Sequence, residues 1–142
     1  MKVINIPSNI YTQIIAYCIQ GLPDEACGLL GGINDEVTTF YPAGNSARSA
    51  RLYVLDPKDY LRADRDAEVR GITILGVVHS HTHTEPYPSP IDIEQAPDPA
   101  WHYVIVGLGR SLPTLRSYSI SAGTVVEETV QVANGAIADI ID

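Results

Sequence analysis

The stretch His79–Asp92, with the sequence HSHTHTEPYPSPID, decides how the rest of the chain is interpreted. It contains three of the four histidines of the chain and directly follows the apolar run Ile72–Val78. Side chains alternate along a β-strand, so a strand that ends in His79-Ser80-His81 directs both imidazoles to one face. Two imidazoles, followed further along the chain by the carboxylate of Asp92, make a three-ligand set for a divalent metal. The sequence therefore predicts that the chain is a scaffold for a metal site.

A second His-x-His pair, His81 and His83, overlaps the first. Its ligands would lie further from the regular end of the strand, and the gap to Ser89 would be shorter. We therefore expect His79 and His81 to be the ligands and His83 to lie at the rim of the site.

The composition is typical of one globular domain with an acidic surface. The chain has 142 residues, of which 45% are hydrophobic and 18% charged, and this argues against disorder. Nine basic and 17 acidic residues give a formal net charge of −8. Because no basic stripe is present, we expect no nucleic-acid partner.

The N-terminal residues indicate neither a secretory signal nor a membrane span. They include one Lys, the polar run Pro7-Ser8-Asn9, and polar residues inside the apolar pattern that follows. Cys18 and Cys27 are too few for a disulfide framework and are not spaced as in a zinc ribbon. We expect a cytoplasmic protein without a membrane partner.

The order of elements predicts an α/β (mixed α+β) fold. Apolar residues recur at helical spacing over Ser8–Gln20, and the pairs Asp56-Pro57 and Ser89-Pro90 are typical helix starts. Strands are expected at residues 2–6, 26–32, 36–41, 51–55, 71–79, 101–108, 115–120 and 124–132. One domain over residues 1–132, with a central sheet flanked by helices, accounts for this order. Residues 133–142 have no strong pattern and are expected to form a loose tail.

The spacing of His79-Ser80-His81, Ser89 and Asp92 resembles the signature of the JAMM (MPN+) zinc metallopeptidases. Upstream, Pro23–Gly31 (PDEACGLLG) is similar to the strand that carries the glutamate of this family. The resemblance extends over residues 6–132. It implies a single MPN/JAB1-like domain with a curved central β-sheet and cytidine-deaminase-like layering.

The same resemblance implies roles for individual residues. The two histidines of the signature and Asp92 would bind one Zn²⁺ per chain, Glu25 would be the catalytic base, and Ser89 would steady the oxyanion. Asn45 lies in a loop where related enzymes place a polar residue near the site, so a substrate contact is expected there.

These roles also have physical grounds. Two imidazoles and one carboxylate leave the fourth tetrahedral position of zinc open for water, whose pKa zinc lowers to about 7. Glu25, not bound to the metal, can take the proton of that water and pass it to the departing amine. A hydroxyl donor such as Ser89 near the oxyanion would contribute roughly 2.7–4 kcal/mol.

Within the family, the chain looks most like the bacterial Mec-type enzymes, on the pattern HSHTxTExYPSxxD and the late stretches 100–106 and 115–118. Those enzymes remove cysteine from the C-terminus of a ubiquitin-like sulfur-carrier protein that an adenylating enzyme loads. The resemblance thus implies a carrier partner with a C-terminal Gly-Gly tail. Loop 82–88 would form a wall of the groove for this tail, with His83 and Tyr87 in contact with substrate.

Three alternatives remain at this point. Two histidines and one carboxylate also describe the facial triad of non-haem iron oxygenases. A non-catalytic MPN scaffold would only mediate protein contacts. A JAMM deconjugase for a different ubiquitin-fold tail is the strongest competitor.

Overall fold

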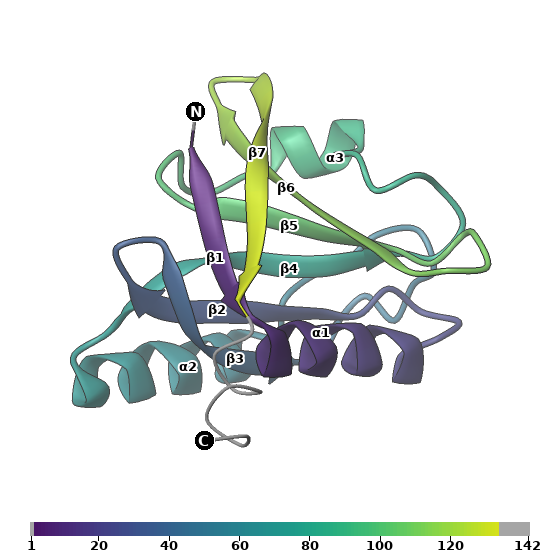
Figure 1. The fold of residues 1–142 in the computed structure, drawn as a ribbon. Helices are drawn as coiled ribbons and strands as arrows, with labels where there is room; N and C mark the ends of the chain where they lie inside the picture. The colour runs from purple at the N-terminus through teal and green to yellow at the C-terminus, as the bar shows by residue number, and fades with distance from the viewer. Residues whose placement is uncertain (1, 134–142) are drawn as a thin grey trace, which may run out of the picture.

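Within residues 2–133, the part of the chain that the computed structural model describes, seven strands form one mixed β-sheet that curves until its edges meet. They are β1 (Val3–Pro7), β2 (Cys27–Ile33), β3 (Glu36–Ala43), β4 (Thr73–His81), β5 (His102–Gly107), β6 (Thr114–Ser121) and β7 (Thr124–Ala133). The order across the sheet is β1-β3-β2-β4-β5-β6-β7. β1 closes the sheet, because it pairs in parallel with β7 and, at Asn5–Glu36, with β3 (Figure 1).

The helices α1 (Ser8–Gln20) and α2 (Pro57–Arg70) cover opposite faces of the central strands. Side chains alternate along these strands, so Leu30 and Val78 join the core cluster beneath α1, whereas Leu29 and Val77 join the cluster beneath α2. The expected sheet flanked by helices is confirmed. Since the end of β4 continues the alternation from Val77, its two histidines lie on the α2 side of the sheet.

The short helix α3 (Pro90–Glu94) lies on the same side of the sheet as α2, because its Ile91 and Asp92 line one pocket with Tyr60 of α2. Both cap-and-proline pairs start helices as the sequence predicts. The Asp56 carboxylate caps α2 by accepting from the Lys58 N–H at 2.8 Å, and Ser89 caps α3. The second cap lies within the stretch His79–Asp92 and places Asp92 in the first turn of α3.

The strand expected at residues 51–55 does not form, and this prediction is wrong. Within residues 2–133, this segment forms one isolated β-bridge, between Asn45 and Leu55, and no strand ladder. The Asn45 side chain instead accepts from the Val54 N–H at 2.9 Å and donates to the Leu52 carbonyl at 3.0 Å. Because a side-chain amide bonds these backbone groups, the segment is an ordered loop and not a sheet strand.

The predicted tail, residues 133–142, lies outside the described residues except for Ala133, which ends β7. Among residues 2–133, no helix is both long and apolar enough to cross a membrane.

Candidate metal centre

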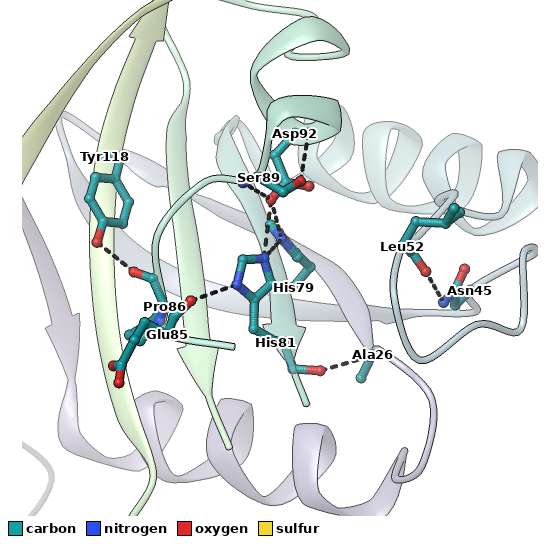
Figure 2. Close-up of polar contacts among 11 residues, drawn as sticks. Ala26, Asn45, Leu52, His79, His81, Glu85, Pro86, Ser89, Asp92 and Tyr118 are labelled. Carbon is teal, nitrogen blue, oxygen red and sulfur yellow. Dashed lines mark hydrogen bonds and ion pairs between the residues drawn. The ribbon is translucent and has the colours of Figure 1, made fainter. Parts of the chain in front are cut away.

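Three side chains that can bind a metal converge at the end of β4. His79 and His81 occupy alternate positions of that strand, and Asp92 lies in the first turn of α3. The Nε2 atoms of the two histidines lie 3.1 Å apart, and each lies 3.1 Å from Oδ2 of Asp92. Figure 2 shows the two rings directed at this carboxylate. The structure thus brings together the three predicted ligands, and His83 is not part of this group.

The spacing of these atoms fits a tetrahedral zinc ion. Metal–ligand bonds of about 2.0–2.1 Å at tetrahedral angles place neighbouring ligand atoms about 3.3–3.4 Å apart, close to the observed 3.1 Å. The ring nitrogens of His79 and His81 also face each other, an arrangement that a cation between them stabilises. Three protein ligands leave one tetrahedral position open, which is typical of a catalytic site.

Neighbouring groups hold the ligands in place. Nδ1 of His81 donates to the Glu85 carbonyl at 2.8 Å, so its Nε2 keeps a free lone pair for a metal. The ring of Tyr53 stacks on His79, with ring centroids 4.3 Å apart. Asp92 accepts from the Ser89 N–H at 2.8 Å. Each ligand therefore has a contact that fixes its orientation.

The electrostatics of the cluster suit metal binding. Burial would raise the pKa of Asp92, but hydrogen bonds with both histidines and the Ser89 N–H outweigh it and lower that pKa well below its usual range. Burial lowers the pKa of His79. Burial would also lower the pKa of His81, but hydrogen bonds to Asp92 and Glu85 outweigh it and raise that pKa, so a proton and a metal compete for this ring.

Glu25 lies next to the cluster, two residues before the start of β2. The antiparallel register pairs Cys27 with His79, so its continuation places Glu25 opposite His81. Only 5% of Glu25 is exposed, and its Oε1 has no hydrogen-bond partner among residues 2–133. Burial raises the pKa of Glu25 to about 7; the charge of His81 lowers it, and that of Asp92 raises it.

Ser89 combines a structural contact with a free donor. Its Oγ accepts from the Asp92 N–H at 3.1 Å and its N–H donates to the Asp92 carboxylate, which forms a capping box. Since Oγ acts as the acceptor in this bond, its own proton remains available to a neighbouring oxygen. The hydroxyl is half-buried beside the ligands.

A family model for prokaryotic homologs of the JAB domain (Prok-JAB) matches residues 7–121. The chain belongs to this family. The resemblance to the JAMM/MPN+ proteins is thereby confirmed, and with it the fold class.

Curated relatives of this Prok-JAB chain are named as peptidases. It is 37% identical over 133 residues to the CysO-cysteine peptidase of Mycobacterium tuberculosis, a match over 92% of this chain and 91% of the relative. It is 32% identical over 108 residues to the probable TtuB-protein conjugate cleaving protease of Thermus thermophilus, over 74% of this chain and 70% of that protein.

Solved structures share the fold. A protein from Desulfitobacterium hafniense superimposes with a TM-score of 0.84 at 34% identity, over 92% of this chain and 93% of the other. A JAMM protein described by its metalloprotease-like zinc site superimposes with a TM-score of 0.57 at 19% identity, over 91% of this chain and 98% of the other.

The remaining predicted site residues lie around the Prok-JAB centre. His83 is exposed, and its Nδ1 lies 2.8 Å from Oγ1 of Thr82. Tyr87 is 55% exposed and packs edge-on against Tyr118. Both therefore remain accessible, and a contact with substrate stays a prediction.

The Asn45 side chain links the Glu25 backbone to the loop of residues 44–56 by hydrogen bonds. Its Nδ2 donates to the Glu25 carbonyl at 2.9 Å and to the Leu52 carbonyl at 3.0 Å. Its Oδ1 accepts from the N–H groups of Ala47 and Val54 at 3.0 and 2.9 Å. All four of its hydrogen-bonding positions are in use, so its contacts in this structure position other residues.

Two further residues of the centre were not found from the sequence. Tyr53, which covers His79, had only its place in an apolar run as a signal. Ser80 lies between the two histidines, and its Oγ accepts from the Ala26 N–H at 2.9 Å. Strand alternation points Ser80 to the other face, which could have suggested that it holds the Glu25 segment.

An apolar pocket of about 180 Å³ adjoins the Asp92 side of the centre. Its lining is largely aromatic and aliphatic and comprises Tyr53, Val54, Leu55, Tyr60, Val77, Ile91, Asp92, Gln95, Pro97 and Trp101. The groove wall expected from the sequence was loop 82–88, so this pocket adds a second surface beside the ligands. It gives the centre an apolar neighbour into which part of a substrate can bind.

Proposed function

We propose that this chain is a zinc-dependent peptidase that hydrolyses the amide bond at the C-terminus of a ubiquitin-like sulfur-carrier protein and releases cysteine. The convergence of His79, His81 and Asp92 next to the buried Glu25 carboxylate carries the proposal. The similarity to the mycobacterial CysO-cysteine peptidase supports the substrate class. Zinc, when bound, lowers the pKa of a water ligand to about 7 and polarises the scissile carbonyl.

In this mechanism Glu25 moves the protons. With its pKa raised to about 7 by burial, the carboxylate can accept a proton from the attacking water and give it to the departing nitrogen at neutral pH. The hydrogen bonds from Asn45 to its carbonyl and from Ala26 to Ser80 keep this segment in place. A fixed base near the reacting atoms lowers the entropic cost of the proton transfers.

Ser89 would stabilise the negative charge that develops on the carbonyl oxygen. Its Oγ is fixed by the Asp92 N–H as a helix cap, and its own O–H can donate to that oxygen. A donor that is already oriented needs no rearrangement during the reaction.

The carrier tail would bind between the apolar pocket and loop 82–88. Two terminal glycines have no side chains and fit a close approach to the ligands, while the pocket has room for an apolar side chain further up the tail. His83 and Tyr87 would contact the tail from the other side. If Tyr87→Phe and His83→Ala both leave kcat/KM for the carrier unchanged, these two contacts should be dropped.

Cleavage of another ubiquitin-like conjugate is the second candidate function. The relative from Thermus thermophilus, named as a probable TtuB-protein conjugate cleaving protease, favours it. Under the first proposal the carrier would be loaded by an adenylating enzyme. The enzyme would work in the cytoplasm, where the buried thiols of Cys18 and Cys27 stay reduced.

The decisive experiment uses the zinc-loaded protein and a ubiquitin-fold carrier that ends in Gly-Gly-Cys. Mass spectrometry should show the loss of one cysteine residue from the carrier. Glu25→Gln should abolish this loss, whereas Asp24→Asn, a matched removal of the neighbouring carboxylate, should retain it. Cleavage of isopeptide-linked conjugates alone would favour the second function and contradict the first.

A further inference from the structure

The loop of residues 44–56, here named the arginine loop, runs along the metal centre. It carries Arg48 and Arg51. Three of its other residues make the contacts with the centre: Ser49 O accepts from the Glu25 N–H at 2.8 Å, Ala50 O accepts from Thr82 Oγ1 at 3.0 Å, and Tyr53 stacks on His79. Both arginines are therefore within two residues of a direct contact with the centre.

Both arginine side chains are free to bind an anion. Arg48 and Arg51 are exposed, and within residues 2–133 neither forms an ion pair. Four other arginines of the described chain pair with a carboxylate, namely Arg62, Arg70, Arg110 and Arg116. Arg65 of α2 also lacks an ion pair within residues 2–133, so Arg48 and Arg51 are distinguished by their place on the loop that contacts the centre.

The arginine loop is held in one conformation. The four hydrogen bonds of Asn45 tie together both halves of the loop and the Glu25 carbonyl, and Figure 2 shows its bond to Leu52. Arg48 has a φ of 47°, a left-handed conformation that is disfavoured for an arginine. Its N–H donates to the Asn45 carbonyl at 3.1 Å, so the surrounding bonds maintain this turn. The arginines are thus presented on a preorganised backbone.

The proposed mechanism places the leaving group next to the arginine loop. In the proposed function Glu25 gives a proton to the departing nitrogen, so the leaving group lies beside Glu25, and the arginine loop contacts Glu25. A C-terminal amino acid carries its α-carboxylate two bonds from that nitrogen, whereas a lysine side chain released from an isopeptide bond has no carboxylate there. A guanidinium group binds a carboxylate through two parallel hydrogen bonds.

We propose that Arg48 and Arg51 bind the free α-carboxylate of the leaving amino acid and select a single C-terminal residue over side-chain amide bonds. This inference rests on the proposed function and names its specificity determinant.

The test compares two carriers that are identical except for the last group, a free carboxylate in one and a carboxamide in the other. The wild type should cleave the acid with a kcat/KM about 10- to 100-fold higher than the amide. Arg48→Gln and Arg51→Gln should each reduce the preference, and the double variant should remove it by slowing cleavage of the acid alone. Arg65→Gln, which changes an exposed arginine of α2, should keep the wild-type preference.

A binding measurement separates failure of this inference from failure of the proposed function. Calorimetric titration of Glu25→Gln with both carriers should show tighter binding of the acid, and adding the double arginine substitution should equalise the two. If the wild type cleaves acid and amide equally, the inference is overturned while the peptidase proposal stands. If neither carrier is cleaved, the peptidase proposal fails; equal binding of both carriers would then overturn the inference as well.

Discussion

Two histidine–carboxylate clusters have their buried histidines on the neighbouring strands β4 and β5, and they differ in where the ring nitrogens point. In the convergent cluster, two rings and one carboxylate direct three ligand atoms to one point. In the divergent cluster, one ring lies between two carboxylates. The convergent cluster consists of His79, His81 and Asp92, and the divergent cluster consists of His102, Glu128 and Asp35.

The divergent cluster has all the partners that a charged imidazole needs. Nδ1 of His102 lies 2.8 Å from Oε1 of Glu128, and Nε2 lies 2.8 Å from Oδ1 of Asp35. Ser117 also donates to Glu128 at 2.8 Å, and Lys2 lies 3.8 Å from its other oxygen. Burial alone would lower the pKa of His102, but its hydrogen bonds with both carboxylates raise it.

The comparison shows how the same residue types serve different purposes. One imidazole with two carboxylates is satisfied by a proton, because each ring N–H has its own acceptor. Two imidazoles that face each other over one carboxylate cannot share protons in this way, and a divalent cation satisfies all three. We therefore infer that the convergent cluster binds a metal and the divergent cluster joins strands.

Replacing a convergent ligand should have the largest effect. His79→Ala or Asp92→Asn should abolish stoichiometric zinc binding and lower kcat/KM on the Gly-Gly-Cys carrier by at least about 10³-fold. His102→Gln should still bind one zinc per chain. Elemental analysis of the purified variants measures the metal directly. Loss of zinc from His102→Gln, with the fold intact by circular dichroism, would remove the distinction between the clusters.

The second prediction concerns stability and compares two adjacent glutamates of β7. Glu128→Ala breaks a buried pair and should lower the free energy of unfolding by about 3–5 kcal/mol. Glu127→Ala removes an exposed ion pair with Arg116 and should cost less than about 1 kcal/mol. Urea titration of both variants checks this. Equal costs would show that the divergent cluster does not hold the strands together.

Chelation should distinguish the clusters through ligand linkage. A metal that binds only the folded chain stabilises it by about 2.7 kcal/mol at a free concentration one hundred times Kd. A chelator should therefore lower the Tm of the wild type and of His102→Gln. It should leave the Tm of His79→Ala unchanged. A chelator effect of the same size in His79→Ala would point to metal binding elsewhere.

The convergence of His79, His81 and Asp92 could be predicted from the sequence because its signal is local. Strand alternation alone places His79 and His81 on one face, and the Ser89-Pro90 helix start places Asp92 in a first turn beside them. The partners of His102 could not be predicted in this way. Asp35 and Glu128 lie 67 and 26 residues from it in the chain, and only the closed sheet brings them together.

The arginine loop shows a second limit of prediction from the sequence. Residues 51–55 have the β-branched and aromatic composition of a strand, but a strand needs a neighbour with free backbone groups. The Asn45 side chain takes those backbone groups instead. A single side-chain amide therefore decided the local structure, and with it the position of Glu25, in a way that periodicity does not reveal.

The smallest expected effect is a pH dependence confined to the divergent cluster. Because the pKa of His102 is raised in the folded state, its protonated form stabilises the fold below about pH 6.5, the value for an unperturbed histidine. This stabilisation should be lost as pH rises through the folded-state pKa. The stability difference between wild type and His102→Gln should therefore be largest at acidic pH and shrink above neutrality, when unfolding is measured with chelator present. Titration of the convergent histidines occurs in both proteins and cancels in the difference, so a gap that widens with pH would mean that His102 is held neutral.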